Sequence, residues 1–321
     1  MASIRDAVGS TPLVHLGGPR RDGGAEVYLK LEYLNPGGSH KARAARAMLT
    51  DLERRGELVP GSGQTLVVAT GGNLGICTTL FAGSDYHVVL VVPDTYSPRR
   101  VELLRALGAE IVVAETDPDS GRLSHTNLAL RLQLQHPDWM PIDQFVDPMN
   151  AEGHRSTGYE LLAAPSGRRI DFFIGGVGSG GSITGIGEVL KEANPRTSVV
   201  AVQPAGCDIL ADRFVAHSIE GLAVGLRPPG LNLEVIDRWV SVTMAEARAA
   251  ALRLLREEGI AVGPSTGANV HVALRIAAVA APGARIVTLA YDGLHNYLDG
   301  GFNLGAMCPP EESIVTIPPD E

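Results

Sequence analysis

The chain has 321 residues, and its 27 Lys and Arg against 36 Asp and Glu give a formal net charge of -9. This acidic balance argues against binding to nucleic acid or to an anionic membrane surface, because neither counterion release nor electrostatic steering favours it. Hydrophobic residues make up 45% of the chain and charged residues 20%. This composition excludes disorder for most of the chain and predicts one large or two smaller globular domains.

The N-terminal segment and the cysteines indicate a cytoplasmic protein. The start MASIRDAVGS lacks the charged-then-apolar pattern of a signal peptide, and no apolar run approaches the ~18 residues of a membrane span. Cys77, Cys207 and Cys308 are far apart and not in CxxC spacing, so neither a disulfide framework nor a metal site is indicated. We expect no metal and no membrane contact.

Short apolar runs alternate with amphipathic stretches along the chain. The apolar runs are too continuous for sheets with one solvated face, so they predict buried parallel strands. Strands and helices in alternation predict an α/β fold with doubly wound, mostly parallel sheets. In chain order, we expect a strand at 25–32, a helix at 40–56, a strand at 65–70, a helix at 73–83, a strand at 88–93, a helix at 97–108, strands at 111–115 and 172–178, a helix at 182–193, a strand at 198–204, helices at 244–258 and 266–280, and a strand at 285–292.

Three glycine-rich segments lie at turns between these elements, at 35–41, 70–75 and 175–185. Ligands of doubly wound sheets bind beyond the carboxyl ends of the strands, where strands turn into helices. We therefore expect the three segments to converge on one site.

The segment GGVGSGGSITG (175–185) follows an apolar strand and opens a helix. Its glycines allow backbone N–H groups to converge on an anion, and the helix N-terminus adds its dipole, which suits a phosphate group. A tight strand–helix turn without a ligand is the plainer alternative. Gly176, Gly178 and Gly181 also fit GxGxxG, but the next strand carries Gln203 where a dinucleotide site needs an acidic residue, so a single phosphate is preferred.

Lys41 follows the turn NPGGSH (35–40) and begins a predicted helix. The positive end of the helix dipole and burial both disfavour a charged amine, and a neutral amine is what Schiff-base chemistry requires. A solvated lysine beside Arg43 and Arg46 is the alternative, and for this residue alone the alternative would be preferred.

The combination of segments is more specific than any single one. Lysine after Asn-Pro-Gly-Gly-Ser-His, then TGGNLG (70–75), then the phosphate loop, resembles the cysteine synthase/cystathionine β-synthase group of pyridoxal-phosphate (PLP) enzymes, which have the tryptophan synthase β-like fold. The resemblance covers nearly the whole chain and includes the segments at 9–16, 144–161, 220–232 and 257–269.

The resemblance implies a role for each matching residue. Lys41 would hold PLP as an internal aldimine and later act as base and acid at Cα, Asn73 would bind the ring hydroxyl, and Ser265 would face the pyridine nitrogen. A neutral hydroxyl cannot keep that nitrogen protonated, so β-elimination or β-replacement is favoured over transamination or racemisation. Asn73 and Ser265 also fit helix N-caps, a strong alternative for both. The phosphate cup would be formed by Gly178, Ser179, Gly180, Gly181 and Ser182.

The substrate loop departs from the family. Relatives usually have Thr-Ser-Gly-Asn-Thr-Gly where this chain has Thr70-Gly71-Gly72-Asn73-Leu74-Gly75, so two hydroxyl donors are lost. Backbone N–H groups at a helix start still suit a substrate carboxylate, but the pocket is wider at Gly71 and more apolar at Leu74. The substrate-binding residues implied are Thr70, Gly71, Gly72, Leu74 and Gln144.

Further departures occur near both ends of the chain. The family's Lys-Asp-Arg is Lys41-Ala42-Arg43 here, and His40 either packs against the phosphate or faces solvent. His295, within YDGLHNYL (291–298), either reaches the site or lies on the surface. The direction of Arg213 is open.

We therefore expect β-replacement on an activated L-serine, O-acetyl or O-phospho, through an aminoacrylate, giving cysteine or a specialised β-substituted alanine. The alternatives are a lyase or dehydratase that releases the aminoacrylate to water, and a non-catalytic module that docks a partner's carboxyl tail. The resemblance also implies a homodimer and an active site between two domains. Residues 1–40 and 145–321 would form the larger domain that binds the PLP phosphate, and residues 41–144 a smaller mobile domain.

Overall fold

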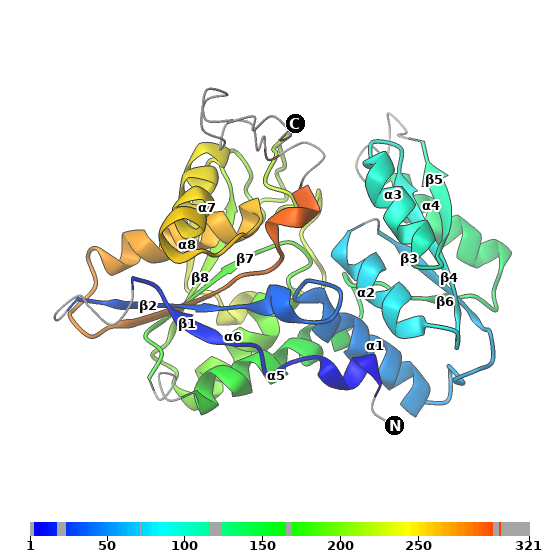
Figure 1. Cartoon of the computed structure of the whole chain (residues 1–321), viewed down its shortest axis with the longest axis horizontal. Coiled ribbons are helices and arrows are strands. Elements are labelled where there is room, and N and C mark those ends of the chain that lie inside the picture. Colours follow the sequence, from blue (N-terminus) through cyan, green and yellow to red (C-terminus); the bar gives the residue numbers. More distant parts are fainter. Residues whose placement is uncertain are drawn as a thin grey trace, which may run out of the picture.

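The computed structural model describes residues 3–17, 24–70, 72–115, 124–164, 169–297 and 302. Figure 1 shows two units side by side, each built on its own sheet, with helix α1 at their junction. In the part of the chain described, no helix is both long and apolar enough to cross a membrane.

The larger unit contains a six-stranded sheet in the order β1-β2-β10-β7-β8-β9. Only β1 runs antiparallel, and the other neighbours pair in parallel with a register that aligns Ile286 of β10 with Val27 and Phe172 on either side. The strands span Leu13–His15 (β1), Glu26–Lys30 (β2), Phe172–Gly176 (β7), Ser198–Pro204 (β8), Arg238–Val242 (β9) and Arg285–Leu289 (β10).

Helices cover both faces of this sheet because consecutive strand residues point to opposite sides. Phe173 of β7 joins the core shared with α5 (Met149–Ala163) and α6 (Gly181–Ala193). Its neighbour Ile174 joins the core shared with α7 (Met244–Glu258) and α8 (Pro264–Ala277). Figure 1 shows the two helix pairs on opposite sides of the strands.

The smaller unit contains a four-stranded, all-parallel sheet in the order β5-β4-β3-β6. Leu66 and Val68 of β3 pack toward α1 and α2, whereas Val67 between them packs toward α4. The elements are α1 (Lys41–Arg54), β3 (Thr65–Ala69), α2 (Asn73–Ala82), β4 (His87–Pro93), α3 (Pro98–Ala106), β5 (Glu110–Ala114), α4 (Ser124–Gln135) and β6 (Met140–Pro141). Short 3₁₀ turns lie at Ile4–Ala7, Glu32–Leu34, Leu233–Val235 and Leu294–Tyr297.

The structure confirms the doubly wound fold with two mostly parallel sheets, and all thirteen predicted elements are present with boundaries shifted by a few residues. Three strands end two or three residues earlier than expected, β2 at Lys30, β7 at Gly176 and β10 at Leu289. The sequence analysis did not find α4 or α5, nor the strands β1, β6 and β9.

Helix α5 escaped detection because it packs through glycines rather than through an apolar stripe. A Cβ at Gly153 would lie 2.5 Å from the Arg43 carbonyl oxygen of α1, and one at Gly158 would lie 2.7 Å from the Val189 Cβ of α6. The absence of side chains at these positions allows three helices to approach closely at the base of the two units.

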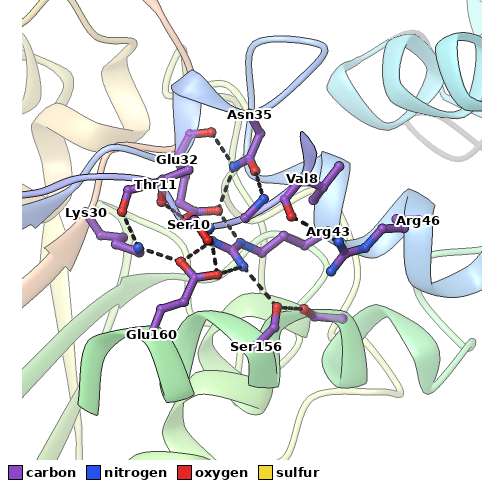
Figure 2. A network of polar contacts seen from close by, with 12 residues as sticks. Val8, Ser10, Thr11, Lys30, Glu32, Asn35, Arg43, Arg46, Ser156 and Glu160 are labelled. Atoms are coloured by element: carbon purple, nitrogen blue, oxygen red, sulfur yellow. Dashed lines mark hydrogen bonds and ion pairs between the residues drawn. The ribbon is translucent and has the colours of Figure 1, made fainter. Parts of the chain in front are cut away.

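A buried ion network fixes α1 against the larger unit, as Figure 2 shows. The Arg43 guanidinium donates to both carboxylate oxygens of Glu32, at 2.7 and 2.8 Å, and to both of Glu160, at 2.7 and 2.9 Å. Lys30 adds a second cation, 2.6 Å from Glu160. Arg43 is 0% and Glu32 1% exposed. Two cations, Arg43 and Lys30, thus balance the carboxylates of Glu32 and Glu160. Arg43 lies two residues after Lys41 on α1.

The ion network makes stability sensitive to acid. Burial would raise the pKa of Glu160, but hydrogen bonds from Arg43 and Lys30 lower it to about 2, against 4.5 for an ordinary glutamate. As the pH falls, Glu160 therefore takes up a proton in the unfolded chain before it does so in the folded chain. The stability that the Glu160 ion pairs contribute is complete above about pH 4.5 and is lost as the pH falls toward 2. Urea midpoints measured between pH 7 and pH 3 should fall less for Glu160→Gln than for the wild type. Parallel pH profiles of the two proteins would contradict this prediction.

Candidate active site

A cavity of about 410 Å³ lies between the two sheets, at the carboxyl ends of their strands. The smaller unit lines it with Lys41 of α1 and with Thr70, Gly72, Asn73 and Leu74 around the head of α2. The larger unit contributes the turn after β7, the head of α8 and the segment after β10. Three segments far apart in sequence therefore converge here, as the positions of the glycine-rich turns predicted. From the larger unit, the lining includes Gly176, Gly178, Ser179, Gly180, Ser182, Ser265, Tyr291 and Asp292.

Lys41 is the first residue of α1, and its amine faces the turn after β7. The Nζ atom donates to the Ser179 Oγ at 3.0 Å. Burial lowers the pKa of Lys41 to about 8, although the nearby Cys77 acts in the opposite direction. The chain has only two other lysines, and both are ion-paired, Lys30 to Glu160 and Lys191 to Asp237. Among the described residues, Lys41 has no carboxylate partner.

The turn after β7 has the form needed to hold an anion. Gly180 is the N-cap of α6 with φ +83°, a backbone conformation that glycine adopts without strain. A Cβ at Gly178 would collide with the Gly221 carbonyl oxygen, and one at Gly181 with the Asn150 side chain. Glycines thus allow the close packing of this turn, and the first N–H groups of α6 have no intrahelical partners.

Ser179 lies at the centre of this turn. Its hydroxyl oxygen accepts hydrogen bonds from Lys41 Nζ and from Asn150 Nδ2, both at 3.0 Å. A hydroxyl oxygen accepts two bonds and donates one, so the Ser179 hydrogen remains available to a ligand oxygen. Glycines where the backbone comes close to other segments, helix N-terminal amides and an available hydroxyl hydrogen together fit a phosphate monoester.

Asn73 and Ser265 line the same cavity from opposite units. Neither is a helix N-cap: Gly72 caps α2, and Gly263 caps α8, which starts with Pro264. The N-cap alternatives considered for both residues are therefore wrong. Asn73 is the first residue of α2, and its amide is held by Asp292 at 2.7 Å. Ser265 is 4% exposed, in the first turn of α8.

The proposed substrate loop forms the wall nearest α2. Thr70 Oγ1 accepts from the Gly72 N–H at 3.1 Å, and Leu74 is buried at 2% exposure. Gln144 lines the cavity, and its Oε1 is buried without a partner among the described residues. Gly71 lies outside the described residues. The open first turn of α2 and the Gln144 amide are the groups here that can bind a carboxylate.

The sequence left the direction of three residues open: His40 and His295 line the cavity, and Arg213 does not. His40 does not face solvent freely: its ring stacks on His154 at 5.5 Å and packs against Tyr291 at 4.6 Å. Burial and the nearby Lys41 lower the pKa of His40, so its ring is neutral. His295 lines the mouth of the cavity while remaining exposed. Arg213 instead pairs with Asp208 at 3.6 Å on the surface.

Sequence reasoning missed Asn150, His154 and Arg100 as residues of this region. Asn150 and His154 lie on α5, which was not predicted; both fall in the segment 144–161 that carries the resemblance, but no role was assigned to either. Arg100 extends from α3 across the cavity mouth to Glu220, at 2.8 Å, and to the Asn296 carbonyl.

Cys77 lies beneath the turn that precedes Lys41, with its Sγ 3.7 Å from Ser39 Oγ. Burial raises the pKa of Cys77 to about 12. At pH 8 its thiolate fraction is then roughly one in 10⁴, so we expect no alkylation of the folded protein on a timescale of minutes. Peptide mass spectrometry after iodoacetamide treatment, with and without urea, tests this prediction. Labelling of Cys77 without urea would contradict it.

Comparison with known proteins defines the class and then the family. Two solved structures of a synthase place the fold in the tryptophan synthase β-like class. In the first, an O-ureido-L-serine synthase superimposes with a TM-score of 0.87 at 37% identity over 94% of both chains. A second structure of that enzyme, a lysine-to-alanine mutant bound to O-ureido-L-serine, gives a TM-score of 0.89 at 35% identity over 98% of this chain and 96% of the other. The chain belongs to the family of pyridoxal-phosphate dependent enzymes, whose sequence profile matches residues 4–292.

Characterised relatives cover nearly the whole chain. Cysteine synthase of Staphylococcus aureus is 38% identical over 299 residues, which are 92% of this chain and 95% of that protein. O-ureido-L-serine synthase of Streptomyces lavendulae is 38% identical over 301 residues, which are 92% of this chain and 90% of that protein. These matches confirm the expected resemblance to the cysteine synthase group and PLP as the cofactor.

Proposed function

We propose that the chain catalyses PLP-dependent β-replacement on an activated L-serine, giving cysteine or a specialised β-substituted alanine. The observation that carries this proposal is the half-buried Lys41, whose amine lies 3.0 Å from Ser179 at the head of a glycine-rich anion site. Cysteine synthase and O-ureido-L-serine synthase relatives of similar length support the reaction class.

The cofactor fits the cavity through residues of both units. The phosphate would bind the N–H groups and hydroxyls of Gly178 to Ser182, the ring hydroxyl would meet Asn73, and the pyridine nitrogen would face Ser265. When bound, PLP withdraws electrons from the amino acid and thereby permits loss of the β substituent.

Lys41 would move the proton at the substrate Cα. Its pKa of about 8 leaves a useful fraction of neutral amine near neutral pH, as a general base requires. The hydroxyl of Ser179 would hold the amine close to the phosphate site. The neighbouring His40 ring is neutral and adds no competing charge.

The substrate carboxylate would bind the first turn of α2, with Thr70, Gly71, Gly72 and Leu74 around it and the Gln144 amide opposite. The Leu74 side chain replaces a hydroxyl with apolar surface. We infer that this wall favours a second substrate other than sulfide, and the O-ureido-L-serine synthase relatives support a specialised product.

The domain division also belongs to this proposal. Residues 41–144 would form the smaller, mobile domain, and residues 1–40 and 145–321 would stay fixed around the phosphate. The part of the smaller domain beyond α1 would move over the substrate, because the Arg43 ion pairs hold α1 against the larger unit. The separate four-stranded sheet of the smaller unit supports the division. Hydrogen exchange with and without O-acetylserine would show new protection around α2 and α3 if that body closes.

We further propose a homodimer in the cytoplasm, as the family resemblance implies. Light scattering on the purified protein should give twice the chain mass, and cell fractionation should recover the protein with the cytosol. A monomer at micromolar concentration, or recovery elsewhere, would refute these two points.

The reaction is tested by mixing the PLP-loaded protein with O-acetylserine or O-phosphoserine and with sulfide, hydroxyurea or an amine, and identifying products by mass spectrometry. The proposal predicts a β-substituted alanine that forms only when both substrates are present. Pyruvate and ammonia without a second substrate would indicate a lyase, and the absence of any spectral change would refute catalysis on serine derivatives.

A further inference from the structure

Two side chains of the smaller unit hold the segment that follows β10 in the larger unit. Asn73, at the head of α2, contacts Asp292 and Asn296. Arg100 of α3 donates through Nε to the Asn296 carbonyl at 3.1 Å and lies over the Tyr297 ring at 5.4 Å. The position of Asn73 therefore depends on groups across the cavity.

Asp292 is the centre of these contacts. It is 3% exposed, and its Oδ2 accepts from Asn73 Nδ2 and from the Tyr297 hydroxyl, both at 2.7 Å. Its Oδ1 is buried with no partner among the described residues. That oxygen lies against Gly263, where a Cβ would be only 2.5 Å away. The absence of a side chain at Gly263 thus leaves the space that Oδ1 occupies.

A carboxylate only accepts hydrogen bonds, so it determines which way the Asn73 amide faces. The Nδ2 group must face Asp292, and the Oδ1 atom receives the Asn296 Nδ2 at 3.3 Å. An amide nitrogen carries two hydrogens, and Asp292 takes one of them. The second is left for a group in the cavity that Asn73 lines.

We propose that Asp292 is a positioning residue whose carboxylate orients the Asn73 amide so that an N–H, and not the carbonyl oxygen, faces the ring oxygen of bound PLP. This inference rests on the proposed function. Asn296 holds the amide from the opposite side, and Arg100 holds Asn296 in place.

The substitution Asp292→Asn separates this role from simple packing because it keeps the shape and removes one acceptor. An amide at position 292 can accept from Asn73 and Tyr297 only if its own NH₂ takes the place of Oδ1. That NH₂ would then be buried in the tight space beside Gly263, where a donor without an acceptor costs free energy. The reverse orientation sets an NH₂ against Asn73, which can then turn its carbonyl oxygen toward the cofactor.

The test compares PLP complexes of the wild type, Asp292→Asn and Asp171→Asn. Asp171→Asn is the matched control, because it removes a carboxylate that accepts from the Arg285 N–H at the opposite end of β10 and does not line the cavity. The proposal predicts that Asp292→Asn shifts the visible absorbance band of the bound cofactor and weakens PLP binding at least about tenfold. Asp171→Asn should keep the wild-type band and dissociation constant.

An unchanged band in a folded Asp292→Asn protein would overturn the inference while leaving the proposed function intact, because the wild type would still bind PLP. Failure of the wild type to bind PLP would overturn both. A purely structural role would lower the melting temperature without moving the band. If Asp292→Asn does not fold, Asp292→Ser decides: a hydroxyl can donate as well as accept, so it no longer fixes the Asn73 amide and should shift the band, whereas a wild-type band would overturn the inference.

Discussion

Lys41→Met is expected to lower kcat/KM for β-replacement by at least about a thousandfold, the scale of losing a positioned proton-transfer group. The same change should stabilise the cofactor-free protein at pH 7. The Lys41 pKa is about 8 in the folded chain against 10.5 for an ordinary lysine, so at pH 7 folding buries a charge. Methionine removes that cost, on the order of 1–3 kcal/mol. Steady-state rates and urea unfolding measure the two effects.

The pH dependence of the free energy of unfolding independently checks the lowered pKa of Lys41. Between pH 8 and 10.5 the unfolded wild type binds more protons at this site than the folded protein, so wild-type stability from this group rises with pH in that window. The methionine variant should lack the rise. Lys191→Met is the matched control, because Lys191 pairs with the surface Asp237 and lies outside the cavity. Equal losses of rate in both variants would contradict the assignment of Lys41.

Arg43→Met is expected to destabilise the protein by about 3–5 kcal/mol, because it leaves the buried Glu32 carboxylate without its cation. Arg43 makes four hydrogen bonds to Glu32 and Glu160, and Glu32 is only 1% exposed. Chemical unfolding of the cofactor-free protein measures the loss.

Three further variants test this reading of Arg43. Arg43→Lys keeps the charge but loses the paired geometry and should cost less. Glu32→Gln combined with Arg43→Met should recover part of the stability, because the orphaned charge is gone. Arg253→Met breaks an exposed pair with Glu257 and should cost under about 1 kcal/mol. Wild-type stability of Arg43→Met, or no recovery in the double variant, would contradict the account.

The sequence predicted the glycine turns and the strands behind them because each has a local cause, whereas Lys41 was assigned only through the combination of segments. A turn needs glycine where the backbone comes close to another segment, and buried parallel strands need continuous apolar runs. Such causes are visible within a few residues. The convergence of three turns follows from the general rule that parallel strands present their carboxyl ends at one edge.

The parts of the site that escaped prediction depend on long-range contacts. Helix α5 carries its packing in Gly153 and Gly158, which give no apolar periodicity, so the helix was not predicted. The resemblance of residues 144–161 assigned no role to Asn150 or His154. In α4, Leu128, Leu130, Leu132 and Leu134 alternate with period two and mask a helix whose buried residues are Ser124 and Ala129. The bond between Asn73 and Asp292 spans 219 residues and has no local pattern.

The ion network shows the same limit. Arg43 was weighed as part of a basic helix face beside Lys41, yet it is fully buried, because Glu32 and Glu160 reach it from two other elements. Because Arg43 follows Lys41 by two residues on α1, the contacts that hold Arg43 also hold the start of the helix. The helix that presents the amine to the cavity is fixed at its first turn by neutralised charges, so the amine stays in place.

The most direct test uses the three lysines of the chain. The protein is loaded with PLP, reduced with borohydride, digested and analysed by peptide mass spectrometry. The account predicts a phosphopyridoxyl group on Lys41 alone, lost when PLP is omitted, with Lys30 and Lys191 unmodified. Modification of Lys30 or Lys191 in place of Lys41, or no modified lysine at all, would contradict it.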